Sequence, residues 1–333
     1  MDRQAPEQST AAAGGRRGAF NYLDQSVESS LYRNGKVFTR RDRDGSDSAF
    51  EGAVLDERLM AVTSARDLRG GDRPTLAHSG FELRAEPLSD PGLDFFHNHS
   101  VVSRYYPECE HIIQDATGAA VVRAFDHNVR SAAGKERQRR IEGGQSVQGP
   151  AHLVHGDYTL TSAPQRLRDL TKPPGSNDTL RDHLGADRAL LDPDQVAEAL
   201  ASGRFAIINL WRNIVAEPVV TDPLALCGAH TVEPRDLVVF EIHYADRVGE
   251  NYFAKHSPRH RWYFYPELTR AEALLIKQWD SAGAMARSSG ARADASDAKA
   301  PCTFSFHSAF QDPTTPPDAP DRWSIEVRCV VIY

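Results

Sequence analysis

The segment Leu153-Val154-His155-Gly156-Asp157-Tyr158-Thr159 decides how the rest of this sequence is interpreted. Residues i and i+2 of a β-strand share one face, so His155 and Asp157 are expected to point together into the interior of a β-barrel. An imidazole nitrogen beside a carboxylate oxygen provides two of the three ligands of a 2-His-1-carboxylate facial triad, which leaves adjacent metal positions open. The pattern is short, and by itself it also fits an ordinary polar strand end.

A candidate for the third ligand lies near the C-terminus. His307 ends an aromatic stretch that begins at Phe304, and a proline-rich turn follows it. In the strand expected after that turn, four polar side chains share one face: Arg322, Ser324, Glu326 and Arg328. A guanidinium group binds a carboxylate through two parallel hydrogen bonds. The sequence therefore predicts a third metal ligand followed by an anion site, with an exposed face of alternating charge as the alternative.

The segments around these residues are mostly short strands. Strands are expected at 119–125, 205–211, 236–244, 303–307 and 322–332, and helices at 108–117, 194–202 and 269–279. Strands without regular helical crossovers favour an antiparallel sandwich or barrel over a parallel sheet. We therefore expect a mainly β (α+β) protein, a double-stranded β-helix or jelly roll with flanking helices.

The organisation of the chain follows from its composition. Residues 1–17 are rich in Ala, Gly, Gln and Ser, which predicts a disordered tail before a single jelly-roll domain at 18–333. Two long polar segments, 131–150 and 281–300, are expected to be mobile loops, and loops of this length often act as lids. One precedes His155 and the other precedes His307, so both are close in sequence to the candidate site.

The overall charge and the cysteines narrow the class of protein. A net charge of −7, from 39 basic and 46 acidic side chains, argues against a dedicated nucleic-acid binder. The four cysteines are far apart and are expected to be reduced, buried thiols. There is no run of about 18 apolar residues to span a membrane. These features predict a cytoplasmic protein without nucleic-acid or membrane partners. A small-molecule substrate and dioxygen are the partners expected from the candidate metal site.

Eight segments occur in the order found in a known protein family: Tyr106–Glu108, Phe125–Arg130, Val154–Thr159, Ile208–Arg212, Asp222–Cys227, Leu275–Ser281, His307–Pro313 and Arg322–Arg328. On these segments, about two thirds of the chain resembles the fungal and bacterial hydroxylase/desaturase family. That family includes a gibberellin desaturase and a protein of cephalosporin 7α-methoxylation. Asn213 and Gly228 stand where the family pattern has proline and aspartate. If those two positions line the pocket, the substrate differs from that of the better-known members.

The resemblance implies an iron(II)- and 2-oxoglutarate-dependent dioxygenase of secondary metabolism, releasing succinate and CO2. It assigns the catalytic metal ligands to His155, Asp157 and His307. It assigns the distal carboxylate of 2-oxoglutarate to Arg322, helped by Ser324, with Arg328 as the reserve candidate or a substrate anchor. The outcome of the reaction, which is hydroxylation, desaturation or ring formation, stays open.

Several other polar residues are candidates for the pocket. Asn209 is expected to contact 2-oxoglutarate, and four residues are expected to contact the substrate: Arg212, Tyr158, His127 and Arg130. Ordinary structural hydrogen bonding is the alternative for these residues.

Two other classes of protein also fit the pattern. One is a redox-silent metal-dependent hydrolase or isomerase on the same fold, and the other is a non-catalytic jelly roll that binds a small molecule. The anion site behind His307 counts against the first class. The presence of all three metal ligands counts against the second.

Overall fold

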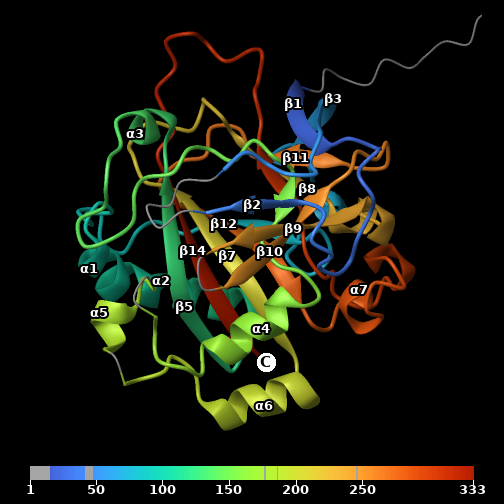
Figure 1. Cartoon of the computed structure of the whole chain (residues 1–333). Helices are drawn as coiled ribbons and strands as arrows, with labels where there is room; N and C mark the ends of the chain where they lie inside the picture. The colour runs from blue at the N-terminus through green and yellow to red at the C-terminus, as the bar shows by residue number, and fades with distance from the viewer. Residues whose placement is uncertain (1–15, 42–47, 176–177, 186, 245–246) are drawn as a thin grey trace, which may run out of the picture.

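Two β-sheets make up most of the computed structural model, which describes residues 16–41, 48–175, 178–185, 187–244 and 247–333 (Figure 1). In spatial order the larger sheet of these residues contains β1 (Arg16–Leu23), β3 (Leu55–Ser64), β11 (Trp262–Phe264), β8 (Leu224–Cys227), β13 (His307–Ala309), β6 (His155–Gly156), β10 (Val248–Ala254), β9 (Leu237–His243) and β2 (Phe38–Arg40). The smaller sheet contains β4 (Phe81–Ala85), β12 (Glu272–Asp280), β7 (Phe205–Asn213), β14 (Ser324–Ile332) and β5 (Val121–Arg130).

The two sheets share one hydrophobic core. Phe304, which precedes β13 of the larger sheet, stacks with Tyr252 of the same sheet and with Trp279 of the smaller sheet at ring-centroid distances of 6.0 and 6.5 Å. Every residue of β7, at the centre of the smaller sheet, is buried, because neighbouring strands and both faces of the sheet are covered. The larger sheet is mixed, with two parallel pairs, and the smaller one is antiparallel; the two curled sheets around a common interior form the jelly roll that the strand pattern predicts.

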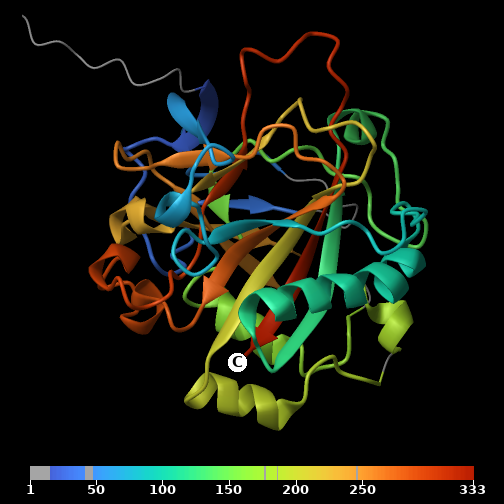
Figure 2. The same ribbon diagram turned by 180° about the vertical axis from the view of Figure 1, so that it is seen from behind.

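Helices cover the outer face of the smaller sheet. Figure 2 shows α2 (Tyr106–Thr117) lying across that face, where it packs on β5 and β14. The remaining helices are short: α1 (Asn98–Ser100), α3 (Ala132–Glu136), α4 (Ser162–Asp169), α5 (Arg181–Leu184), α6 (Pro193–Ala201) and α7 (Ala284–Arg287). The predicted helices at 108–117 and 194–202 are therefore confirmed as α2 and α6.

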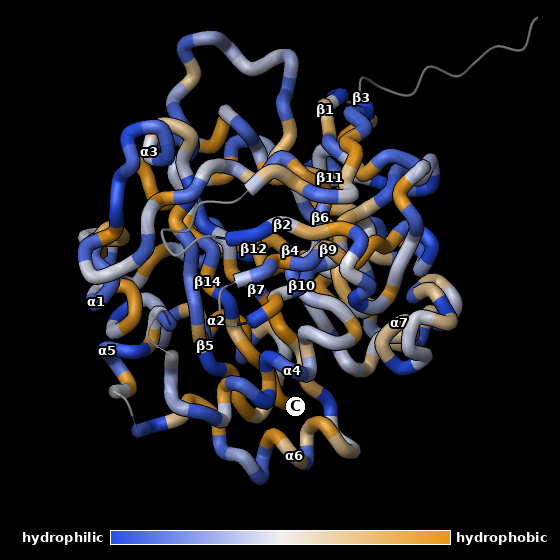
Figure 3. The backbone as a smooth tube through the Cα atoms, viewed as in Figure 1, coloured by the Kyte–Doolittle hydropathy of each residue, from blue (hydrophilic) through white to orange (hydrophobic). Residues whose placement is uncertain are grey.

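The sequence signals of α6 agree with its structure. The Asp192 carboxylate accepts hydrogen bonds from the backbone N–H groups of Asp194 and Gln195, each over 3.0 Å, and Pro193 occupies the first turn, where no donor is needed. Hydrophobic and hydrophilic residues alternate along this helix (Figure 3). Val196 and Ala199 are buried, so one face packs on the protein and the other faces solvent.

The helix expected at 269–279 is wrong, because this segment forms strand β12. The Thr269–Glu272 pair that resembles a helix N-cap does form, with the Thr269 N–H donating to Glu272 Oε2 over 2.9 Å, but it closes a turn. β12 is bonded to β4 on one side and β7 on the other, and eight of its nine residues are buried. A short apolar run buried on both faces has no alternation that distinguishes a strand from a helix.

The predicted tail and loops are only partly described. Residues 1–15 lie outside the described residues, whereas Arg16 and Arg17 belong to β1, so the boundary expected at 17 is two residues too late. The 131–150 segment contains α3. The 281–300 segment contains α7, and its residues Met285, in that helix, and Asp294, beyond it, are buried. The mobility of both segments stays a prediction.

The states of the cysteines and the character of the helices agree with two further expectations from the sequence. The four cysteines are unpaired and buried, as expected. Within the described residues, no helix has the length and apolar character needed to cross a membrane.

Candidate metal centre

Two very short strands bring the metal-ligand candidates together. His155 lies in β6 and His307 in β13, and the two residues are directly paired across neighbouring antiparallel strands. Asp157 follows β6, so its side chain lies on the same side as that of His155. Gly156, between them, faces the Phe304 ring, and a Cβ at this position would lie 3.1 Å from that ring. A larger residue would therefore require the Phe304 ring or β6 to shift by a few tenths of an ångström.

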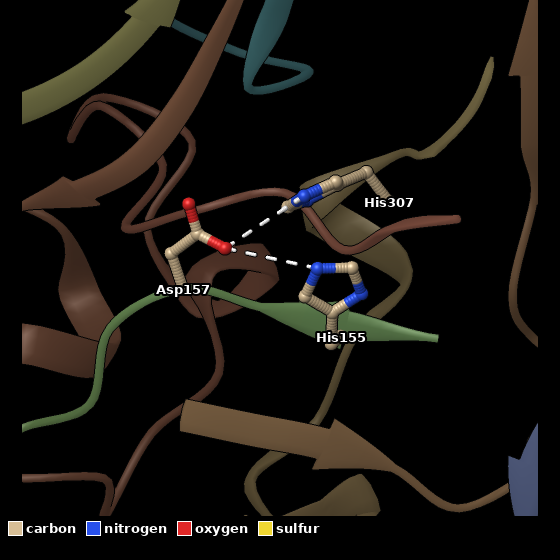
Figure 4. Close-up of side chains that lie close together, drawn as sticks. All are labelled: His155, Asp157 and His307. Atoms are coloured by element: carbon tan, nitrogen blue, oxygen red, sulfur yellow. Dashed lines mark ion pairs between the residues drawn. The ribbon is translucent and has the colours of Figure 1, made fainter. Parts of the chain in front are cut away.

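The three side chains converge on a common point (Figure 4). Asp157 Oδ1 lies 3.7 Å from His155 Nε2 and 3.9 Å from His307 Nε2. One potential ligand atom from each residue lies within 4.8 Å of the others. The exposed fractions of the three side chains are 12, 9 and 5% for His155, Asp157 and His307, so the cluster is largely shielded from bulk water.

The protonation states suit metal binding. Burial lowers the pKa of His155 to about 4, and burial also lowers the pKa of His307. Burial alone would raise the pKa of Asp157, but the charges of Arg328 and the two histidines hold it below its usual range. His155 Nδ1 lies 2.6 Å from the Leu153 carbonyl oxygen, which can only accept, so Nδ1 carries the proton and Nε2 is free. Two neutral imidazoles and a carboxylate are the donors that a divalent metal ion requires.

The smaller sheet orients the Asp157 carboxylate. Asn209 of β7 donates to Asp157 Oδ2 over 2.9 Å, and Arg328 Nε of β14 lies 3.4 Å from the same oxygen. The side chain of Gln278 in β12 accepts from the backbone N–H of Asp157 over 3.1 Å. Asn209 therefore holds a metal-ligand candidate, and its expected contact with 2-oxoglutarate stays a prediction.

The charge of Arg328 is already balanced. Its NH1 lies 2.9 Å from Asp126 Oδ2, and its NH2 lies 3.2 Å from Glu326 Oε1, in addition to the contact with Asp157. A guanidinium shared among three carboxylates has no free edge for another anion. The structure therefore differs from the expectation that Arg328 is a reserve site for 2-oxoglutarate or a substrate anchor.

Arg322 and Ser324 are buried and incompletely paired. Arg322 is 3% exposed and donates from NH1 to the Asp222 carbonyl oxygen, whereas its Nε has no hydrogen-bond partner in the described chain. Ser324 Oγ also lacks a partner there. Burial lowers the pKa of Arg322 to about 10, and the charge of Asp222 offsets this effect only in part. Buried donors without partners are costly, so this pair suits a bound carboxylate such as that of 2-oxoglutarate.

Two residues expected to contact the substrate face the wrong side of the smaller sheet. Arg212 is fully buried and donates to Tyr105 Oη, to the Glu86 and Arg270 carbonyl oxygens, and to Glu108 at 3.4 Å. His127 Nδ1 lies 2.9 Å from the Tyr106 hydroxyl of α2. Arg212 and His127 are three residues from Asn209 and Arg130, respectively, and residues three apart on a strand face opposite ways. Both have structural roles between the sheet and α2.

Tyr158 and Arg130 are the other two residues that the sequence assigned to the substrate. Tyr158 follows Asp157 directly, and burial raises its pKa to about 12. Arg130 is the last residue of β5 and is paired with Ser324, so it lies on the strand face that also carries Asp126 and Arg328. The predicted contacts of Tyr158 and Arg130 with a substrate stay predictions.

Sequence reasoning missed three residues that position Asp157 or its partners. Gln278 was hidden because its strand was assigned as a helix. Asp126 and Glu326 both contact Arg328, and strand alternation already placed Glu326 on the same face as Arg328. The sequence did contain one signal for this cluster: an arginine that shares a strand face with two other charged residues needs a partner if that face is buried.

The family model for the oxidoreductase/YMDC permease-like domain matches residues 20–332. The chain belongs to this family. Several curated relatives match more than half of the chain, including the following three. An uncharacterised protein encoded near dcmA in Methylophilus leisingeri is 47% identical over 195 residues, which are 58% of this chain and 88% of the relative. The hydroxylase/desaturase poxK of Penicillium oxalicum is 28% identical, and the match covers 81% of this chain and 79% of poxK.

The third relative carries a more specific name. The alpha-ketoglutarate-dependent dioxygenase tstK of Talaromyces stipitatus is 29% identical over 87% of this chain and 91% of its own length. These names confirm the predicted relationship between this oxidoreductase domain and hydroxylase/desaturase proteins.

A solved structure confirms the fold. The iron and alpha-ketoglutarate-dependent endoperoxidase NvfI aligns with a TM-score of 0.68 over 95% of this chain and 97% of its own, at 20% identity. At that identity the likeness shows the shared fold, the predicted jelly roll.

Proposed function

We propose that this oxidoreductase-domain protein is an iron(II)- and 2-oxoglutarate-dependent dioxygenase that oxidises a C–H bond of a small secondary-metabolite-type molecule. The observation that carries the proposal is the convergence of His155, Asp157 and His307, and an arginine and a serine with unpaired buried atoms at the start of β14 support it. The fungal relative named as an alpha-ketoglutarate-dependent dioxygenase supports the same co-substrate. A cytoplasmic location and the absence of nucleic-acid partners stay predictions.

The chain supplies two matched halves of the site. His155, Asp157 and His307 would hold the metal ion from the larger sheet, and Arg322 with Ser324 would hold the distal carboxylate of 2-oxoglutarate from the smaller one. When bound, iron and 2-oxoglutarate together activate dioxygen and remove hydrogen from the substrate, while 2-oxoglutarate is oxidised to succinate and CO2.

The residues around the ligands keep the site ordered. The Leu153 carbonyl oxygen fixes the tautomer of His155, and Asn209 turns Asp157 Oδ1 toward both histidines. The low exposure of all three side chains excludes bulk water, which would otherwise compete at the open metal positions. Each of these contacts holds a donor atom in place before any ligand arrives.

Anaerobic titration tests the proposal. We expect a weak visible charge-transfer band when Fe(II) and 2-oxoglutarate are both present, because the co-substrate then chelates the metal. His307→Ala should abolish the band, whereas His99→Ala, at an exposed histidine, should leave it unchanged. Folded protein that binds iron but gives no band would contradict the proposal and favour a redox-silent metalloenzyme.

A further inference from the structure

Arg322 and Ser324, the two residues that suit the distal carboxylate of 2-oxoglutarate, are separated by Trp323. The guanidinium carbon of Arg322 lies 5.9 Å from the centre of the Trp211 ring. Trp211 shares one face of β7 with Asn209, which binds the candidate metal-ligand carboxylate. Arg322 therefore lies on the face of the smaller sheet that is turned toward the candidate metal ligands, and alternation directs Trp323 to the opposite face.

On that opposite face, the Trp323 side chain packs against the segment that contains α3. Its ring lies 5.3 Å from the Phe96 ring, centre to centre, in an edge-to-face arrangement. The guanidinium carbon of Arg139 lies 3.6 Å from the centre of the Phe96 ring and 5.1 Å from that of Trp323. Asp321 accepts a hydrogen bond from the hydroxyl of Ser131, the N-cap of α3. Both chain neighbours of Arg322 are therefore tied to the α3 segment.

Gly134 of α3 is the residue against which the Trp323 ring lies. A Cβ at this position would be 2.5 Å from Trp323 Cη2, 3.0 Å from its Cζ3 and 2.8 Å from Val147 Cγ1, which is closer than carbon atoms pack. A glycine inside a helix is destabilising relative to alanine, so its presence in the middle of α3 needs another reason. The contact with Trp323 supplies that reason, because only a residue without a side chain leaves room for the indole ring.

A change at this contact would reach the carboxylate site through the backbone. Trp323 lies between Arg322 and Ser324 in the chain, and its carbonyl oxygen accepts from the backbone N–H of Ile214 over 3.0 Å. In the free protein this part of the chain can shift to relieve an overpacked contact, whereas a bound carboxylate holds both flanking residues in place. Strain that differs between the free and the bound state changes the affinity for the ligand.

We infer that Gly134, through its contact with Trp323, positions Arg322 and Ser324 and thereby sets the affinity of the protein for 2-oxoglutarate. This inference rests on the proposed function, because it takes Arg322 and Ser324 as the co-substrate site. Gly134 acts through Trp323 and is therefore a positioning residue. Coupling between two sites is reciprocal, so a co-substrate that binds more tightly when the contact is intact must also stabilise the contact. Binding of 2-oxoglutarate should therefore make α3 more ordered.

The first arm of the test uses the wild-type protein and needs no substitution. Backbone amide hydrogen exchange is measured on the anaerobic Fe(II) protein alone, with 2-oxoglutarate, and with 2-oxopentanoate, which has the same carbon chain without the distal carboxylate. The amides of Gly134 and Lys135, which bond to Ser131, should exchange about fivefold more slowly with 2-oxoglutarate. 2-Oxopentanoate should leave their exchange unchanged. Equal protection by both acids, or no protection by 2-oxoglutarate, would overturn the inference.

The second arm changes the contact itself. The Kd for 2-oxoglutarate is taken from the charge-transfer band of Gly134→Ala, Trp323→Phe and the double variant. Overpacking should weaken 2-oxoglutarate binding about tenfold in Gly134→Ala. The Kd for Fe(II), measured by calorimetry, should stay within about twofold, since the metal ligands belong to the larger sheet. Trp323→Phe removes the outer ring atoms that the new Cβ would meet. The double variant should therefore bind 2-oxoglutarate within about threefold of Trp323→Phe alone.

Gly71→Ala is the matched control, because a Cβ there would meet no atom of the described chain within 4 Å, and its Kd for 2-oxoglutarate should equal that of the wild type. A Gly134→Ala protein that loses stability in urea but keeps its 2-oxoglutarate affinity would overturn the inference and leave the contact a purely structural one. Equal losses of Fe(II) and 2-oxoglutarate affinity, or a double variant without recovery, would do the same. A wild-type protein with no charge-transfer band would instead contradict the proposed function.

Discussion

Asn209 Nδ2 donates a hydrogen bond to Asp157 Oδ2 over 2.9 Å, and this bond joins the centre of one sheet to a metal-ligand candidate of the other. With Oδ2 held, Oδ1 is left to face both histidines. Removing such a partner of a metal-binding carboxylate typically weakens metal affinity about 10- to 100-fold. We expect Asn209→Leu to weaken Fe(II) binding by this factor in anaerobic calorimetry. Asn213→Ala is the control on the same strand, since Asn213 contacts carbonyl oxygens of Glu217 and Leu268, and its metal affinity should stay within twofold.

Arg328 is expected to be essential for stability. Replacing it by Met leaves the carboxylates of Asp126, Glu326 and Asp157 buried together without their shared cation. Breaking a buried ion pair in this way costs about 3–5 kcal/mol. Urea denaturation of metal-free Arg328→Met should show a loss of that order. A loss below about 1 kcal/mol would mean that water or proton uptake neutralises the cluster.

Arg212 should affect stability without affecting ligand binding. Its guanidinium ties β7 to α2 and to two loop carbonyl oxygens, and it points away from the metal centre. Because these acceptors stay buried when the donor is lost, Arg212→Met should lower the free energy of unfolding by about 3 kcal/mol. The Kd for 2-oxoglutarate, measured well below the melting temperature, should stay within about twofold. A selective loss of co-substrate affinity would restore the original assignment of Arg212 to the pocket.

Asp280 and Lys277, which form a buried ion cluster at β12 together with Arg204, should contribute unequally to the free energy of unfolding. Asp280 is bound by Lys277 at 2.9 Å and by Arg204 at 2.6 Å. Asp280→Asn leaves the buried Lys277 ammonium without its carboxylate, whereas Lys277→Met leaves Asp280 paired with Arg204. Asp280→Asn should therefore destabilise the protein by at least about 2 kcal/mol more than Lys277→Met. Equal losses in thermal and urea unfolding would show that Lys277 is neutral in the folded protein.

His127 should make stability fall as the pH is lowered. Burial lowers its pKa to about 4, opposed by Asp126, whereas an unfolded histidine titrates near about 6.5. Between these two values the unfolded chain binds more protons, so stability present above about pH 6.5 is lost as the pH falls toward 4. From pH 7 to pH 5 the contribution of His127 to this loss is about 2 kcal/mol. The urea unfolding free energy of His127→Gln should vary less over this range than that of the wild type. Parallel curves would show that His127 takes up its proton over the same pH range in the folded and unfolded states.

The spacing of ligands could be predicted from the sequence because it depends only on local geometry. His155 and Asp157 share a face in any strand, and His307 lies just before a turn and an arginine-bearing strand. The jelly roll followed from strand-rich segments with few helices. These inferences needed no knowledge of which strands become neighbours.

Assignments that depended on sheet context were less successful. β12 carries apolar residues without a period, and only its pairing with β4 and β7 on both sides makes it a strand. Arg212 and His127 lie on strands that do reach the metal centre, but their side chains occupy the opposite face. Strand alternation already excluded Arg212 once Asn209 was placed inside, so that error was avoidable. Among the partners of Arg328, Glu326 could have been predicted from strand alternation, whereas Asp126 could not, because it lies about 200 positions away in the sequence.

The division of the centre between two sheets makes the spacing of those sheets a property of the site. The candidate metal ligands belong to the larger sheet, whereas Arg322 and Ser324 accompany the smaller one. Phe304 packs between Tyr252 of the larger sheet and Trp279 of the smaller sheet, so a change of volume at this core residue would alter the distance between the two parts of the site without replacing any of its ligands.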